Sequence, residues 1–295
     1  MRKNINLFQI ITAVILIALC ILCLLPFVLL VSSSLTDETI LIREGYGFLP
    51  KVFSVDAYAY LLRNSDMIVR AYANSILITF VGTFLNLLFT TLLAYPLSKP
   101  DLPYRNQWSF FVFFTMLFNG GVVSTYIMYT QYFHIRNTYF ALLIPNLLLG
   151  SFYVIMMRSY FSQNIPEEVV EAARVDGAGE WFILAKIVLP MSKPIMATLA
   201  LLVGLQYWND WINGLYYLTK DKYFTIQIVL NNMLKTMQVL ASNSSSASSN
   251  INAASLPTLG VKMAIAVIGI LPILCIYPFF QRFFVKGITI GAVKG

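Results

Sequence analysis

The sequence predicts an all-α protein that crosses a membrane several times. Of its 295 residues, 58% are hydrophobic and only 11% are charged, whereas soluble globular domains carry about 25% charged residues. Apolar stretches of about 20 residues, the length that a helix needs to cross a bilayer, recur along the chain. We therefore expect a polytopic membrane protein with six transmembrane helices, at 8–31, 73–97, 108–132, 139–157, 195–218 and 261–280.

The first stretch is expected to remain as a membrane anchor, because no small-residue cleavage site precedes Thr36. An even number of spans places both termini on one side of the membrane. Basic residues flank both ends, at Arg2 and Lys3 and again at Arg282 and Lys286, so we expect both termini in the cytoplasm. The net charge is +7, and the basic residues are scattered over loops that flank the spans. This distribution indicates contacts with lipid headgroups and not with nucleic acid.

The segment 164–194 differs from the other connections because it is charged and has two helical patterns. A helix is expected to start near Pro166, with Glu167 and Glu168 favoured by the helix dipole. Gly177 suits a left-handed C-terminal cap. At about 100° per residue, one face should pack and the other should be free for recognition. The packing face is Val169, Val170, Ala172 and Ala173, and the opposite face is Glu167, Glu171 and Arg174.

Glu171 can pair with Arg174 three residues later, or with a basic group on a partner. The second pattern, at 180–188, is apolar nearly all round and is expected to pack between the first helix and the membrane bundle. Pro190 should end it, and Ser192 and Pro194 should begin the next membrane helix.

Polar residues inside spans are costly in lipid and therefore mark helix contacts or a solute pathway. Two groups stand out: Asn119 and Gly120 in the third span, and Tyr207, Trp208, Asn209, Asp210 and Trp211 in the fifth. Aromatic faces beside amide and carboxylate groups suit a sugar. An interfacial aromatic belt with amide bonds between helices explains the same residues equally well.

No catalytic constellation and no metal cluster is expected. The sequence holds one histidine, His134, and the cysteines Cys20, Cys23 and Cys275 lie in apolar spans, where cysteine acts as a small apolar side chain. The ending GITIGAVKG lacks the Ser or Thr that follows Lys in a phosphate-binding loop. We therefore expect a non-enzyme without a cofactor of its own.

The run EAARVDGAGEWFILAKIVLP, from Glu171 to Pro190, resembles the signature of the membrane subunits of binding-protein-dependent ABC importers. With the QYWNDW stretch and the basic glycine tail, the resemblance is to the second permease subunit of the maltose-type carbohydrate uptake family. It implies a type I ABC importer permease fold in which the 164–194 loop is a cytoplasmic coupling-helix loop that docks on the ATPase. The residues that the resemblance assigns to ATPase coupling are Glu168, Glu171, Ala172, Ala173, Arg174, Asp176, Gly177, Leu189 and Pro190.

The resemblance also implies roles for the remaining loops. In the maltose-type subgroup the C-terminal tail, here 282–295, reaches the ATPase, which makes Gly291 and Lys294 candidates; a disordered stub is the alternative. The external loop 219–260 would approach the binding protein. Its Ser- and Asn-rich part, 241–254, is either a contact with an oligosaccharide or binding protein, or a flexible tether.

The resemblance implies a multi-pass protein of the bacterial cytoplasmic (inner) membrane that imports a sugar or oligosaccharide. Its expected partners are a second homologous permease, two ATPase subunits (dedicated or shared) that bind ATP and Mg²⁺, and an extracytoplasmic sugar-binding protein. Two alternatives remain open. One is a self-contained secondary transporter that uses Asp210, and the other is a non-transporting membrane scaffold.

Overall fold

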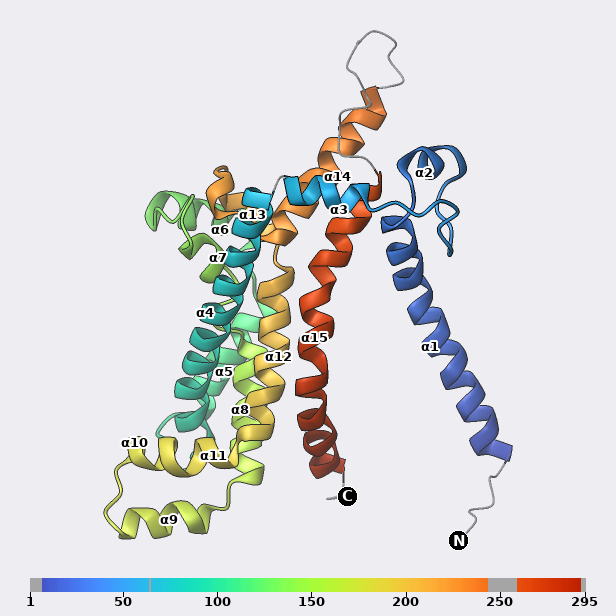
Figure 1. Cartoon of the computed structure of the whole chain (residues 1–295). Helices are drawn as coiled ribbons and strands as arrows, with labels where there is room; N and C mark the ends of the chain where they lie inside the picture. The colour runs from blue at the N-terminus through green and yellow to red at the C-terminus, as the bar shows by residue number, and fades with distance from the viewer. Residues whose placement is uncertain (1–6, 64, 244–258, 293–295) are drawn as a thin grey trace. The chain divides into compact units, whose positions relative to one another are not determined.

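The computed structural model is all-helical throughout the residues it describes, which are 7–63, 65–243 and 259–292 (Figure 1). An isolated bridge between Thr36 and Phe53 is the one extended pairing in this part of the chain. The elements are α1 (Leu7–Ser34), α2 (Glu38–Glu44), α3 (Asp56–Arg63), α4 (Ser65–Ser98), α5 (Arg105–Leu117), α6 (Gly121–Ile127), η1 (Met128–Tyr132), α7 (Phe140–Leu143), α8 (Ser151–Asn164), α9 (Glu167–Val175), α10 (Glu180–Ile183), η2 (Leu184–Val188), α11 (Leu189–Met191), α12 (Lys193–Asn209), α13 (Ile212–Tyr217), η3 (Asp221–Tyr223), α14 (Ile226–Asn243) and α15 (Leu259–Ala292). The all-α membrane fold expected from the sequence is confirmed.

The chain divides into two compact units. Unit 1 consists of Met1–Ile68 and Leu230–Pro272, and unit 2 consists of Val69–Val229 and Ile273–Gly295. Within unit 1, both carboxylate oxygens of Glu38 in α2 accept hydrogen bonds from the first backbone amides of α15. The distances are 3.0 Å from Leu259 N and 3.1 Å from Gly260 N. A carboxylate at a helix N-terminus satisfies free amides and complements the helix dipole, so Glu38 holds α2 against the start of α15.

Three helices are long and apolar enough to cross a membrane, at Phe8–Ser34, Asp66–Ser98 and Leu259–Pro278. They coincide with the spans expected at 8–31, 73–97 and 261–280. Two bent helix pairs pass the same test of length and composition, so the described residues contain up to five candidate spans. The expected count of six therefore stays a prediction.

The span expected at 108–132 is not one straight helix. Instead, α5 is followed after a short break by α6 and η1, and the two parts make an angle of 107°. Gly121 has φ of +78°, a value that favours glycine. The backbone amide of Gly121 donates a hydrogen bond of 2.9 Å to Asn119 Oδ1. Gly121 and its hydrogen bond to Asn119 therefore separate α5 from α6, which runs in another direction.

The fourth and fifth expected spans are also interrupted. At 139–157, α7 ends at Leu143 and α8 begins only at Ser151, with Asn146 left-handed between them (φ +61°). At 195–218, α12 ends at Asn209 and α13 starts at Ile212. The irregular segment between α7 and α8 has carbonyl groups that no helix satisfies. Two buried amides bond to them: Asn86 Nδ2 donates to Leu147 O (2.6 Å), and Asn213 Nδ2 donates to Pro145 O (3.0 Å).

The core of unit 2 lies where α4 meets α12. The Tyr207 side chain on α12 is 2% exposed, and its hydroxyl donates a hydrogen bond of 2.9 Å to Leu143 O. Its ring lies directly over Gly82 on α4, where an added Cβ would be 2.5 Å from the ring carbons. Small residues at such contacts let helix backbones approach closely. Gly82 therefore provides the space that the tyrosine ring fills.

Replacing Gly82 with alanine is expected to destabilise the protein by about 1–3 kcal/mol, because the held ring cannot move aside without strain. The matched control is Gly204→Ala on α12, where a Cβ would be an acceptable 3.5 Å from Thr83 Oγ1. The measurement is the midpoint of thermal unfolding of both variants in the same detergent. An unchanged midpoint for Gly82→Ala would contradict the role given to this contact.

Candidate functional site

The charged 164–194 loop folds as two helical segments joined by a tight turn at one end of unit 2 (Figure 1). The first, α9, runs from Glu167 to Val175, with Pro166 at the N-cap position. Glu167 and Glu168 lie in the first turn and Arg174 in the last, so each charge complements the helix dipole. The expected start of the helix near Pro166 is confirmed.

A glycine-dependent cap ends α9. Gly177 has φ of +85°; its amide donates to Arg174 O (3.0 Å), and the Ala178 amide donates to Ala173 O (2.9 Å). This pair of bonds is the Schellman motif, which reverses the chain after a helix. The left-handed cap expected at Gly177 is confirmed.

The buried face of α9 is narrower than expected. Val170 is 3% exposed and packs with Ala173 against the core, as expected. Val169 and Ala172 were placed on the same face, but both are exposed. Residues three apart lie on the same face of a helix, and the face that meets the core is the one with Val170 and Ala173. The exposed face carries Glu168, Glu171, Ala172, Val175 and Asp176.

The second segment runs further than Pro190, which was expected to end it. It consists of α10, the π-helical turn η2 and α11, and ends at Met191. The chain then turns by 81° into α12. Pro190 lies in the first turn of α11, a position at which a missing amide proton is tolerated. Leu189 is partly buried against the core.

One face of this second segment is buried, and the other is not. Ile183, Leu184 and Val188 pack into the core, whereas Trp181 is 74% exposed and Phe182 is also exposed. The segment is therefore not enclosed on all sides, as its apolar sequence had suggested. Ser192 and Pro194 do begin α12, as expected, but the Ser192 hydroxyl forms no cap hydrogen bond.

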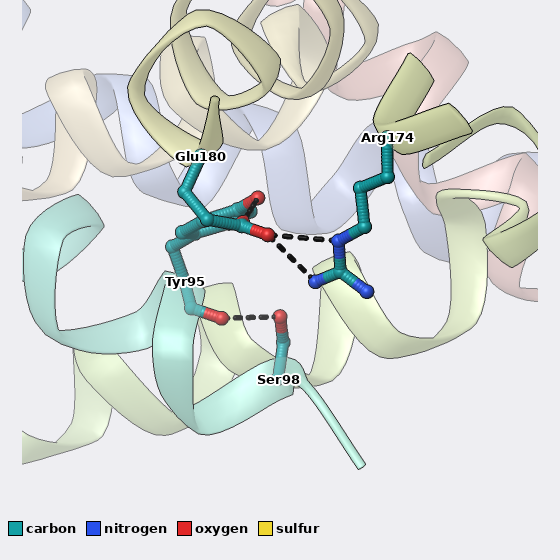
Figure 2. Close-up of polar contacts among 4 residues, drawn as sticks. All are labelled: Tyr95, Ser98, Arg174 and Glu180. Carbon is teal, nitrogen blue, oxygen red and sulfur yellow. Dashed lines mark hydrogen bonds and ion pairs between the residues drawn. The ribbon is translucent and has the colours of Figure 1, made fainter. Parts of the chain in front are cut away.

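The Glu180 carboxylate at the start of α10 joins three parts of unit 2 (Figure 2). Its Oε1 accepts a hydrogen bond of 2.8 Å from Arg174 Nε and lies 2.7 Å from Arg174 Nη2. Its Oε2 accepts a hydrogen bond of 2.6 Å from the hydroxyl of Tyr95 in the last turn of α4. Arg174 thus pairs with Glu180 and not with Glu171, because the Schellman turn brings α10 back beside the end of α9. We call Tyr95, Glu180 and Arg174 the anchor.

Hydrogen bonding keeps the anchor charged at neutral pH. The pKa of Glu180 lies below its usual value, mainly because Tyr95 donates to the carboxylate and further because Arg174 does, against the opposing effect of burial. The pKa of Arg174 is raised, first by its hydrogen bond to Glu180. A lowered carboxyl pKa means that the interaction persists at neutral pH and is lost only as the pH falls through that lowered value.

Two cavities flank the anchor, with volumes of about 240 Å³ and 480 Å³. Tyr95 and Lys99 line both of them. The Lys99 ammonium lies 4.8 Å from the centre of the Tyr95 ring, and burial lowers the pKa of this lysine. The polar contacts of the anchor therefore join α10 to α4 between two cavities, beside the apolar packing of Ile183 and Leu184.

The residues expected along a solute pathway lie at two places. Tyr207 and Trp208 are buried at the end of α12 and serve in packing, whereas Asn209 and Trp211 are exposed. The Oδ1 atom of Asp210 accepts a hydrogen bond of 3.2 Å from the Asn213 amide in α13, so this carboxylate helps to start that helix. Asn119 and Gly120 lie at the break between α5 and α6.

The tail from 282 to 292 is not the disordered stub given as the alternative, because α15 continues to Ala292 and Gly291 is helical. Lys294 lies outside the described residues, as does most of the Ser- and Asn-rich stretch. Tyr95 and Glu180 were not singled out as site residues. Their side chains come from positions 85 apart in the sequence, and no local pattern links such positions.

The fold defines a class of protein: a helical membrane protein with several candidate spans and a charged, two-helix loop at one end of unit 2. Residues 76–290 match the family described as "Binding-protein-dependent transport system inner membrane component". The chain belongs to this family, and the membership expected from the sequence is confirmed.

Individual relatives are similar along nearly the whole chain. Protein LplC of Bacillus subtilis is 36% identical over 272 residues, covering 92% of this chain and 90% of that protein. The polygalacturonan/rhamnogalacturonan transport system permease protein YtcP of Bacillus subtilis is 33% identical over 294 residues, covering 99% and 100%. A crystal structure of a bacterial ABC transporter that imports the acidic polysaccharide alginate contains a chain with a TM-score of 0.80 and 28% identity, covering 96% and 99%.

The cap at Gly177 can be tested by substitution. Gly177→Val should cost about 1–2 kcal/mol, since a left-handed conformation is unfavourable for residues with a Cβ, and should reduce ATP-dependent transport by the assembled importer. Gly177→Asn is the control, because asparagine tolerates this conformation and nothing lies within 4 Å of a Cβ at this position. Equal transport by the two variants would show that the cap does not matter for coupling.

Proposed function

We propose that this chain is the membrane-spanning subunit of an ATP-driven sugar or oligosaccharide importer and forms half of its translocation pathway. In this proposal the 164–194 loop docks on a separate ATPase subunit, with α9 as the coupling helix. The observation that carries the proposal is the exposed face of α9 on a rigid, glycine-capped turn, in a chain that belongs to a family of importer membrane components.

The exposed face of α9 has the chemistry of a recognition surface. It presents the carboxylates of Glu168, Glu171 and Asp176 beside the side chain of Val175, which is 87% exposed. Within the described part of the chain, none of these carboxylates forms an ion pair. An apolar contact surrounded by unpaired acidic groups suits a basic groove on a partner, since charge complementarity favours correct docking.

The substrate class is inferred from relatives and from the end of α12. YtcP is a polygalacturonan/rhamnogalacturonan transport system permease protein, and the alginate importer takes up an acidic polysaccharide; we extend an oligosaccharide substrate to this chain. Asn209 and Trp211 are exposed near the end of α12, where an indole face and an amide could contact a sugar ring and its hydroxyl groups.

The proposed transport cycle uses the partners expected from the sequence. Two ATPase subunits bind ATP and Mg²⁺ and close, and α9 moves with the subunit on which it is docked. The membrane subunits then change from inward-open to outward-open, and an extracytoplasmic binding protein delivers the sugar. Each ligand shifts this equilibrium only by its different affinity for the two states. Both termini and the 164–194 loop lie in the cytoplasm in this arrangement, and a second homologous permease completes the pathway.

The test is purification of the tagged full-length chain from its native membrane in mild detergent, with identification of stoichiometric partners. An ATPase, a second permease and a binding protein are expected. Glu171→Lys should lose the ATPase, because like charges facing each other across an interface disfavour binding. Asp221→Lys is the matched control, since this exposed carboxylate in η3 is next to Lys222, whose carbonyl accepts a hydrogen bond from Asn74 near the start of α4, whereas the loop contacts the last turn of α4.

Two outcomes would contradict the proposal. An ATPase that remains bound to Glu171→Lys as well as to Asp221→Lys would remove α9 from the docking surface. A chain that is recovered alone and moves solute in vesicles without ATP would instead be a secondary carrier.

A further inference from the structure

One carboxylate connects the loop to the longest helix of unit 2. Glu180 lies in the first turn of α10, Arg174 in the last turn of α9, and Tyr95 in the last turn of α4. The three contacts are 2.6–2.8 Å long. Such short bonds with an ionised acceptor are directional, so they fix orientation as well as distance.

The anchor is placed where apolar packing is incomplete. Val170 and Ala173 hold the middle of α9 to the core, whereas the end of α9 and the start of α10 line the larger cavity through Arg174 and Glu180. The second segment is held to the core by Ile183, Leu184 and Val188, so without the anchor it is α9 that could change its direction relative to α4. With it, the loop and the end of α4 move together.

The opposite end of α4 is held in an equally specific way. Asn74 donates from Nδ2 to Lys222 O (2.9 Å) and to Phe224 O (3.0 Å), and its Oδ1 accepts from the Tyr139 hydroxyl (3.1 Å). The Ile226 amide donates to Ser75 Oγ (2.9 Å). Because α4 runs for 34 residues, or about 50 Å, one rigid element joins the loop to the other end of unit 2.

We infer that Tyr95, Glu180 and Arg174 are positioning residues that transmit movement of the docked loop to α4, and through α4 to the segment around Lys222. This inference rests on the proposed function, since it assumes that a partner moves the loop. The anchor contributes little to stability, because Glu180 and Arg174 are partly exposed and such ion pairs are weak in water. Its loss should therefore affect coupling much more than folding.

The structure supplies closely matched variants. Tyr95→Phe removes the hydroxyl and keeps the ring, which lies 6.5 Å from the Phe161 ring. Glu180→Gln keeps the shape of the side chain and removes its charge. Tyr160→Phe is the control, because this α8 tyrosine is partly buried in the same core and its hydroxyl has no partner among the described contacts. Arg174→Glu combined with Glu180→Arg reverses the ion pair.

The first measurement is the distance distribution between spin labels at Val169→Cys on α9, which is exposed but lies outside the proposed docking face, and at the exposed Phe84→Cys on α4. It is made on the full chain in its purified complex, with Cys20, Cys23 and Cys275 replaced by serine. Tyr95→Phe and Glu180→Gln should broaden the distribution, and Tyr160→Phe should not. Each single charge reversal should broaden it, and the double reversal should narrow it again.

The second measurement is the stimulation of ATP hydrolysis by the binding protein in the reconstituted importer. Tyr95→Phe and Glu180→Gln should lose most of this stimulation, and Tyr160→Phe should keep it. A distribution as narrow as that of the parent in both anchor variants, or full stimulation in both, would overturn the inference. Absence of an ATPase from the parent complex would instead overturn the proposed function, while the distance measurement would still test the anchor.

Discussion

Backbone groups in an apolar environment must find hydrogen-bond partners within the protein, and the arrangement of unit 2 depends on this constraint. Where the chain leaves helical geometry between α7 and α8, buried amides of Asn86 and Asn213 bond to its free carbonyls. Near the start of α4, Asn74 does the same for the segment around Lys222. These asparagines are the reason that breaks in the helices are possible, and the breaks in turn place the ends of α12 and α13.

The same constraint explains why the 164–194 loop is built differently. It is charged, so it needs few buried polar partners, and its shape comes from helix caps and one ionised anchor. The Schellman turn at Gly177 reverses the chain within a few residues, and this reversal alone brings Arg174 within reach of Glu180. The docking role that we propose for α9 requires a fixed direction more than it requires stability, and short charged hydrogen bonds provide direction.

Membership of the importer family and the geometry of the loop support each other. The family match covers residues 76–290, which include α9, the anchor and nearly all of unit 2. The exposed face of α9 explains what a partner would recognise, and α4 offers a continuous path from that face to the opposite end of the unit. The alternative carrier mechanism would use the carboxylate of Asp210. This carboxylate accepts a hydrogen bond from the backbone amide of Asn213 and so helps to start α13, which is a structural reason for its presence.

Local properties of the sequence determined the helical class, the long apolar helices α1, α4 and α15, the start of α9 at Pro166 and its end at Gly177. Hydrophobic length, helix dipoles and glycine conformation act over a few residues, so they can be read along the chain. Only the tertiary structure decided the breaks in the third, fourth and fifth expected spans, the exposure of Val169 and Ala172, and the pairing of Arg174 with Glu180. The break between α7 and α8 depends on contacts between residues far apart in sequence, such as Asn86 with Leu147. The bend at Gly121 and the pairing of Arg174 with Glu180 are more local, but they depend on the direction in which the chain continues after a left-handed glycine. A single helix pattern contains no information about which neighbour will satisfy its polar groups.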